Sequence, residues 1–539
     1  MRRAQYYNGY GFFVFVFLVF AVFLIVSNPV INSDDDFYYL YTLAGGYGDP
    51  PSHILHYYYT WHPLLTWPIA ELFKLFPFFN WYTLFLLLIH FISCVLILRL
   101  LITALNKPLG IFFFFIFFLF IEARLLLSLN YSNASIILAV SACSTFLSYY
   151  LNKNEVPSNK KIVLIAVLII LSGLIRMHTL GLCFVLTLIL GFILLKFQIY
   201  KIFAFHSLLI GIVLILFMQA HRFYYESKIP GWESEETFRQ ALFDIANRPN
   251  APYINNDTGE SRIKNSFIKN WFIYDTSFVN NTDIKEFSNK IVSNRFTYND
   301  ENPLIFYWML KEVRVYLLLL LGFFIAFFLF EKYNPLMKWL SFSVISISVF
   351  FYLVFFMKVT ESIFLGIFSS IFFAFIFCLR EQRFKRNLVG SLYFLILIMS
   401  SLWMTVQLVK INKSNIANTR LTRCDLQELM SHQKFLFINS DNTFHDKGFS
   451  IWDSPSKYPV TNLINKELLL TNSYLKVLKR YTDESLMESL TNKNILLLGE
   501  HFPLLNEYYL FEFNQEIKLQ KMSGFKCLNV YRATTLPSD

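Results

Sequence analysis

The segment GFFVFVFLVFAVFLIVSNPVINSDDDFYYLY, residues 11–41, decides the fold. Its apolar part, 11–31, is long enough to cross a bilayer, which takes about 20 residues. No A-x-A cleavage site follows, so the pattern predicts a membrane anchor rather than a signal peptide. Three consecutive carboxylates, Asp34, Asp35 and Asp36, stand where the chain leaves the membrane.

The whole chain shares the character of this segment. Of its 539 residues, 55% are hydrophobic and 16% are charged, against about 25% charged in soluble domains. This composition excludes a soluble enzyme, a disordered protein and a collagen-like fibre, and the solidly apolar runs exclude an outer-membrane barrel. The net charge of +10 comes largely from short loops between apolar runs, so we expect no nucleic-acid partner.

Apolar runs of membrane-spanning length predict a polytopic α-helical membrane protein with about eleven transmembrane helices. The expected spans are 11–31, 81–103, 109–128, 133–151, 162–176, 179–197, 202–220, 312–331, 338–357, 362–380 and 388–410.

Lys and Arg concentrate in alternate loops, which predicts a cytoplasmic N-terminus. Three hydrophilic segments then face outward: the loops 32–80 and 221–311, and the tail 411–539. We therefore expect a membrane domain over 1–410 and an extracytoplasmic domain over 411–539. The abundance of Phe, Ile, Asn and Lys is typical of an AT-rich bacterial genome. For a multi-pass helical protein we therefore expect the inner (plasma) membrane.

The tail is predicted to be a small α/β domain. Residues 434–439 and 494–499 have the pattern of buried strands, 461–492 that of helix, and 516–532 that of two closing strands. Cys424 and Cys527 flank this region, and outside the cytoplasm they could form a disulfide or remain apart. The other cysteines lie in spans, as small core residues.

The acidic cluster is the first candidate site. Adjacent carboxylates raise one another's pKa, so such crowding is typical of a site for a metal, a proton or a hydroxyl. The alternative is a solvated acidic turn in which Ser33 or Asp34 caps a helix.

The next stretch, 47–77, is rich in aromatic residues and histidine and then becomes amphipathic. It predicts a helix lying in the membrane interface. His53, His56 and His62 invite a zinc interpretation. We do not favour it, because Pro50 and Pro51 interrupt the approach.

These motifs resemble, in order, the first outer loop of the GT-C fold glycosyltransferases, which include protein O-mannosyltransferases and lipid A aminoarabinose transferases. Asp35, Asp36 and Tyr39 fit the family's acidic pair followed by Tyr. Residues 62–64, His-Pro-Leu, resemble its later His/Lys-Pro-Pro-Leu segment, with Leu64 in place of the second Pro. The motif resemblance covers about the first 80 residues, and the general architecture extends it to about 220.

The resemblance implies a reaction in which an acceptor hydroxyl attacks a sugar carried on a polyprenyl phosphate, with inversion. It makes Asp35 the leading general base, with Asp36 close behind, while Asp34 orients or only solvates, and it places Tyr39 and His62 at the substrate. No cofactor and no metal are expected. A divalent cation at Asp34 to Asp36 is an alternative that we do not favour.

The leaving phosphate calls for cationic groups at the outer ends of spans. Arg124, beside Glu122, is one candidate, and Arg176 with His178 is another. The alternative for both arginines is an anchoring role at the membrane interface. Trp452 and Asp453 are too short a match to the Trp-Trp-Asp motif of oligosaccharyltransferases and are expected in a surface turn.

The prediction is an integral-membrane inverting glycosyltransferase that transfers a hexosyl or pentosyl group. Its donor would be a polyprenyl-phosphate-linked sugar, its acceptor a cell-envelope glycan, lipid or protein, and its surroundings membrane lipids. One alternative is an O-antigen or capsule polymerase or ligase, whose key Arg and His usually lie in a large outer loop. Another is a lipid-linked glycan flippase or transporter, which should show charges at mid-span and inverted repeats.

Overall fold

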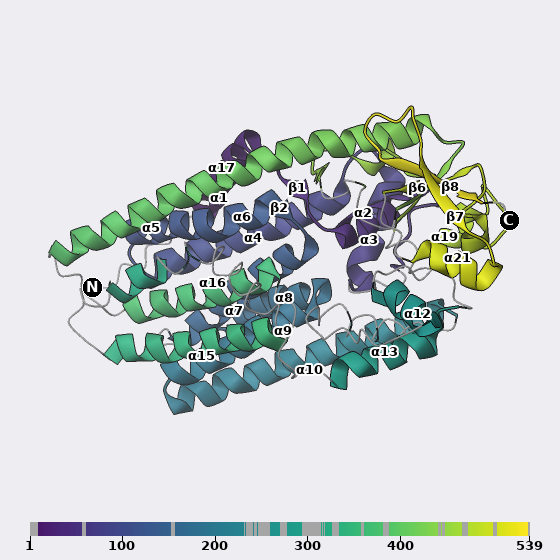
Figure 1. Cartoon of the computed structure of the whole chain (residues 1–539). Coiled ribbons are helices and arrows are strands. Elements are labelled where there is room, and N and C mark those ends of the chain that lie inside the picture. Colours follow the sequence, from purple (N-terminus) through teal and green to yellow (C-terminus); the bar gives the residue numbers. More distant parts are fainter. Residues whose placement is uncertain are drawn as a thin grey trace.

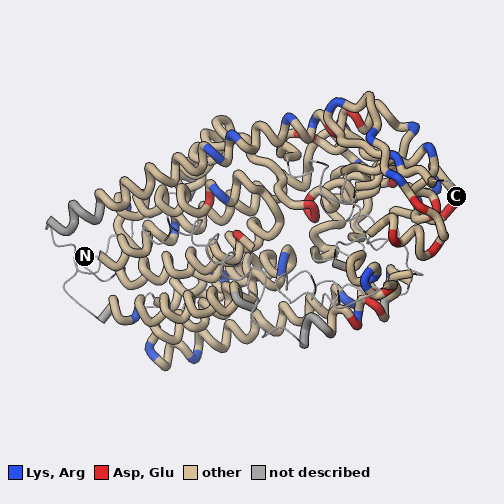
Figure 2. The backbone as a smooth tube through the Cα atoms, in the orientation of Figure 1, with Lys and Arg blue, Asp and Glu red and all other residues tan. Residues whose placement is uncertain are grey.

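The computed structural model describes residues 9–55, 61–151, 157–230, 232, 241, 245, 259–269, 278–293, 314, 316, 319–325, 334–356, 360–380, 388–439, 444, 448–465, 473–499 and 504–536. A bundle of apolar helices forms one end of the molecule, and a small sheet domain forms the other (Figure 1). Charged residues are sparse within the bundle and more frequent along the sheet domain (Figure 2).

Over these ranges, eight helices are long and apolar enough to cross a membrane, which confirms a polytopic helical membrane protein. They are α4 (Trp81–Ala104), the combined helix α5–η1–α6 (Lys107–Phe117, Phe118–Glu122, Ala123–Leu127), α7 (Tyr131–Leu151), α9 (Met177–Leu194), α10 (Phe197–Lys228), α15 (Asn334–Phe356), α16 (Glu361–Leu379) and α17 (Leu388–Ser431).

Two further expected spans are shorter apolar helices, α1 (Gly9–Val26) and α8 (Asn159–Ile175). Most of the expected span 312–331 lies outside the described residues. Helix α7 is the centre of the bundle and packs against α4, α8, α9 and α16. Its many Ser and Ala residues are buried, because small side chains let neighbouring membrane helices approach closely.

Helix α17 joins the bundle to the tail. Its 44 residues extend about 66 Å at 1.5 Å per residue, along the length of the molecule (Figure 1). The helix continues unbroken past 410, where hydropathy suggested a boundary. Cys424, near its end, forms a disulfide with Cys527 of the tail, with 6.0 Å between the Cα atoms.

The tail contains a five-stranded sheet in the order β5-β3-β6-β8-β7. Strand β3 (Leu436–Asn439) is parallel to β5 (Leu463–Asn465) and β6 (Ile495–Leu498), and β8 (Val530–Thr535) is antiparallel to β6 and β7 (Ile517–Lys521). The two buried strands and the closing pair confirm the α/β prediction. The expectation of helix over 461–492 is wrong at its start, because β5 forms there.

Short helices complete the outer parts of the chain. The tail also contains η3 (Pro455–Lys457), α19 (Ser473–Leu478), α20 (Leu486–Ser489) and α21 (Leu505–Phe513). From the second hydrophilic loop, α12 (Gly259–Lys269) and α13 (Asn281–Ser293) are described, and α12 packs against α21.

A second, very small sheet lies between the bundle and the tail. Strand β1 (Val30–Ile31) pairs in parallel with β2 (Ser128–Leu129) and antiparallel with β4 (Phe449–Ser450). Backbone hydrogen bonds of this sheet therefore connect the segment after α1, the turn between α6 and α7, and the tail. The acidic cluster follows β1 directly, so this sheet fixes the start of helix α2 (Asp34–Ala44).

Candidate active site

The three carboxylates occupy the first turn of α2. Ser33 is the N-cap residue, and its hydroxyl accepts a hydrogen bond of 3.3 Å from the Asp36 N–H. The expected cap is therefore present, but the turn is not solvated throughout, because Asp36 is buried. Carboxylates at this position are favoured because the N-terminus of a helix carries partial positive charge.

Asp36 is completely buried. Its Oδ1 accepts hydrogen bonds from the Tyr82 hydroxyl and from the Tyr131 N–H, the latter at 2.8 Å. Burial raises the pKa of this carboxyl from 3.8 to about 7, because the charged form is poorly solvated, even though hydrogen bonding by Tyr82, Ser33 and the Tyr131 backbone acts in the opposite direction. Asp36 thus joins α2 to α4 and α7, and near neutral pH its proton is only partly lost.

Asp35, one residue earlier, is only half-buried. Its Oδ2 accepts a hydrogen bond of 3.4 Å from the Tyr131 hydroxyl. The guanidinium of Arg176 lies 5.1 Å from the centre of the Tyr131 ring and donates a hydrogen bond to the Ser132 hydroxyl. The structure thus brings two predicted residues, Asp35 and Arg176, to the same tyrosine. Sequence reasoning missed Tyr131 itself, whose only signal is its place in the short turn before a span.

The other residues predicted from the first loop have supporting positions. Tyr39 is fully buried, and its ring lies 5.3 Å from that of Tyr131. His62 caps helix α3 (Pro63–Leu75), since its Nδ1 accepts from the Leu64 N–H at 3.2 Å. Its Nε2, which must then carry the proton, donates to the carbonyl of Phe217 at 3.2 Å. Burial lowers the pKa of His62, which favours this neutral form.

His178 is exposed in the first turn of α9, two residues after Arg176. His53 donates to or accepts from the Tyr224 hydroxyl at 2.6 Å, whereas His56 lies outside the described residues. No group of three or more His, Cys, Asp or Glu side chains able to hold a metal occurs in the part of the chain that the structure describes.

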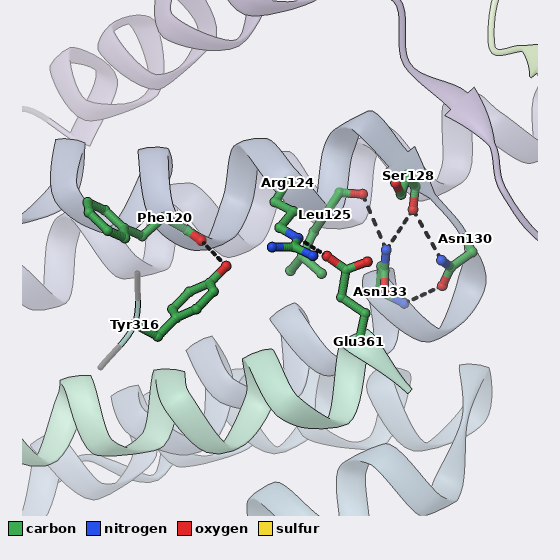
Figure 3. Close-up of polar contacts among 8 residues, drawn as sticks. All are labelled: Phe120, Arg124, Leu125, Ser128, Asn130, Asn133, Tyr316 and Glu361. Carbon is green, nitrogen blue, oxygen red and sulfur yellow. Dashed lines mark hydrogen bonds and ion pairs between the residues drawn. The ribbon is translucent and has the colours of Figure 1, made fainter. Parts of the chain in front are cut away.

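Arg124 lines a cavity of about 550 Å³. Its guanidinium donates to Glu361 at the start of α16 (Figure 3). A second arginine, Arg314, which the sequence analysis did not single out, lies in the same wall. The remaining lining is mostly polar: Asn32, Ser128, Tyr316, Glu361, Trp403, Met404, Gln407, Ile411, Ser414, Asn415 and Asn418. Asn32 precedes the cap of α2, so this cavity adjoins the backbone that carries the acidic cluster.

Glu122, two residues before Arg124, faces the other way. It is fully buried, and its Oε1 lies 2.8 Å from Nδ1 of His90 on α4, which is also fully buried. The residues Phe118–Glu122 form a π-turn, a feature often found at functional sites. This pair anchors the helix that presents Arg124 to the cavity.

The polar turn after Arg124 is held by its own side chains (Figure 3). Asn133 donates to the carbonyl of Ser128 at 2.6 Å, and its N–H donates to Asn130 Oδ1 at 2.8 Å. These bonds fix residues 128–131 between the cavity on one side and Asp35 and Asp36 on the other.

Two crystal structures of ArnT from Cupriavidus metallidurans are similar to this chain. The apo structure gives a TM-score of 0.41 at 10% identity over 97% of this chain and 98% of that chain. The structure bound to undecaprenyl phosphate gives 0.37 at 11% identity over 97% of each. No protein-family profile and no curated protein sequence matches the chain.

Proposed function

We propose that this protein is an integral-membrane, inverting glycosyltransferase of the GT-C type. It moves a sugar from a polyprenyl-phosphate donor to a cell-envelope acceptor at the outer face of the membrane. The observation that supports this most is the association of Asp35, the half-buried carboxylate, with Tyr131 and Arg176. A carboxylate and a cation that meet at the same tyrosine suit a reaction that removes a proton and releases a phosphate.

In this proposal Asp35 is the general base. It takes the proton of the acceptor hydroxyl as that oxygen bonds to the anomeric carbon, and the bond from that carbon to the lipid phosphate breaks. Asp36 acts through position, because its hydrogen bonds to α4 and α7 fix the turn that carries Asp35. The leaving phosphate collects negative charge, and Arg176 or the arginines of the cavity offset it.

The cavity supports a binding site for the phosphate end of the donor. Arg124 and Arg314 supply charge, and the asparagines and Gln407 supply neutral donors. The disulfide between Cys424 and Cys527 supports an extracytoplasmic tail, because disulfides persist in oxidising compartments. In this proposal the tail is outward, so α2 and the cavity lie at the outer face, where lipid-linked sugars and envelope acceptors meet.

The test is a deletion strain complemented with wild type, Asp35→Asn or the double variant Asp35→Asn, Asp36→Asn. We expect wild type to restore one sugar to the surface glycan. We expect Asp35→Asn to lower transfer by about 10²–10⁴-fold, with normal protein levels and with accumulation of the lipid-linked monosaccharide. Normal transfer by the double variant would refute the assignment, and a deletion that changes only chain length or export would favour the polymerase or flippase alternatives.

A further inference from the structure

The turn that contains Trp452 is fastened to the start of a membrane span. The Thr83 hydroxyl in the first turn of α4 donates to the carbonyl of Ile451 at 3.1 Å. The amide of Asn80 donates to the carbonyl of Asp453 at 2.8 Å. The tail segment therefore lies at the level where α4 begins, although more than 360 residues separate the two in sequence.

This position leaves the indole of Trp452 outside the protein. Trp452 is 62% exposed, whereas its neighbours Ile451 and Asp453 are almost completely buried. Arg423 donates to the carboxylate of Asp453 at 2.8 Å, which fixes the backbone beneath the indole. A further bond, from the Ser454 hydroxyl to the carbonyl of Pro77 at 2.8 Å, keeps the turn against the loop before α4.

That loop exposes more aromatic rings. Phe78 and Phe79 are 63% and 53% exposed, and their rings lie 4.6 Å apart. Phe79 also lies 5.5 Å from the ring of Trp81, the first residue of α4. We call Trp452, Phe78 and Phe79 the aromatic patch.

We propose that the aromatic patch inserts into the interfacial zone of the bilayer and seats the tail domain on the membrane. Tryptophan is favoured at this depth because its ring is apolar and its N–H can remain hydrated. In water, the same exposed rings would be an unfavourable apolar surface. Continuity with α4 identifies the occupant as lipid, and the exposed Lys457 next to the patch suits anionic headgroups.

The experiment uses the full chain in nanodiscs of phosphatidylethanolamine and phosphatidylglycerol. The photoreactive substitution Trp452→p-benzoylphenylalanine is compared with the same change at Phe79, inside the patch. The matched control is Phe511, an aromatic residue of α21 in the tail that is 51% exposed. We expect phospholipid adducts at position 452 to match those at 79 and to exceed those at 511 several-fold. Adduct yields at 452 no higher than at 511, or cross-links chiefly to a second copy of the chain or to another protein, overturn the proposal.

A conservative variant provides a second measurement. In nanodiscs containing brominated lipids, Trp452→Phe should reduce the fraction of tryptophan fluorescence that the bromines quench. Trp232→Phe, which removes a buried indole that the bromines do not reach, should slightly raise that fraction. An unchanged quenchable fraction in Trp452→Phe also overturns the proposal.

Discussion

Replacing Asp36 by Asn should change how stability depends on pH. The carboxyl titrates near 3.8 in the unfolded chain, and burial raises its pKa to about 7 in the folded protein. Between these two pKa values the folded state keeps a proton that the unfolded state has lost. The free energy of unfolding therefore falls as pH rises from about 4 to about 7, and it stops falling above the pKa of the folded state. A shift of about three pH units corresponds to about 4 kcal/mol in total.

Asn matches the protonated carboxyl in shape and cannot ionise. Its side-chain oxygen can still accept from Tyr82 and from the Tyr131 N–H, so the fold should be retained. The free energy of unfolding of Asp36→Asn, relative to that of wild type, should increase by about 3 kcal/mol as pH rises from about 5 to about 8. The assay is thermal melting of both purified proteins across this range. If the difference in melting temperature between the two proteins is the same at every pH, Asp36 does not titrate as its burial requires.

Three further predictions concern other parts of the chain. Arg124→Ala should raise the KM for a polyprenyl-phosphate donor by about ten- to hundredfold, as expected for the loss of a charged hydrogen bond. Glu361→Gln should lower this KM, because it removes a carboxylate that competes with the phosphate for Arg124. If both variants change the donor KM in the same direction, the cavity is not a phosphate site. Cys424→Ser should lower the free energy of unfolding by about 4.7 kcal/mol, because the disulfide closes a loop with a sequence separation of 103. If the bond does not form, melting with and without reductant will show no difference. Glu122→Ala should lower the free energy of unfolding by about 3–5 kcal/mol, because it leaves His90 buried without its partner. Replacing both residues by Leu should restore much of this stability. If the losses from the two single variants simply add in a double-mutant melting cycle, the two side chains do not stabilise each other.

The membrane helices were predictable because each is a local signal. An apolar run of sufficient length has few alternatives, so most of the expected spans are found within a few residues of their predicted bounds. The cap at Ser33 and the buried strand at Leu436–Asn439 are local in the same sense. The unbroken course of α17 was not predictable, because hydropathy reports where a helix leaves the membrane and not where it ends.

The contacts that build the candidate site could not be read from the sequence. Strands β1, β2 and β4 have two residues each, which is too short for any periodicity. Tyr131 matters because it meets residues about 95 positions earlier, and nothing in its local sequence indicates this. Arg314 acquires significance only because helices distant in sequence enclose one cavity.

Helical geometry explains why Asp35 and Asp36, which are adjacent and chemically identical, differ in burial. Successive residues on an α-helix point about 100° apart, so Asp36 faces α4 and α7 while Asp35 turns toward the half-exposed side. Tyr131 contacts both, with its N–H on Asp36 and its hydroxyl on Asp35. One residue of α7 therefore contacts both the buried carboxylate and the half-buried one. An acidic pair at a helix start can therefore supply one carboxylate that holds the fold and one that remains available for chemistry.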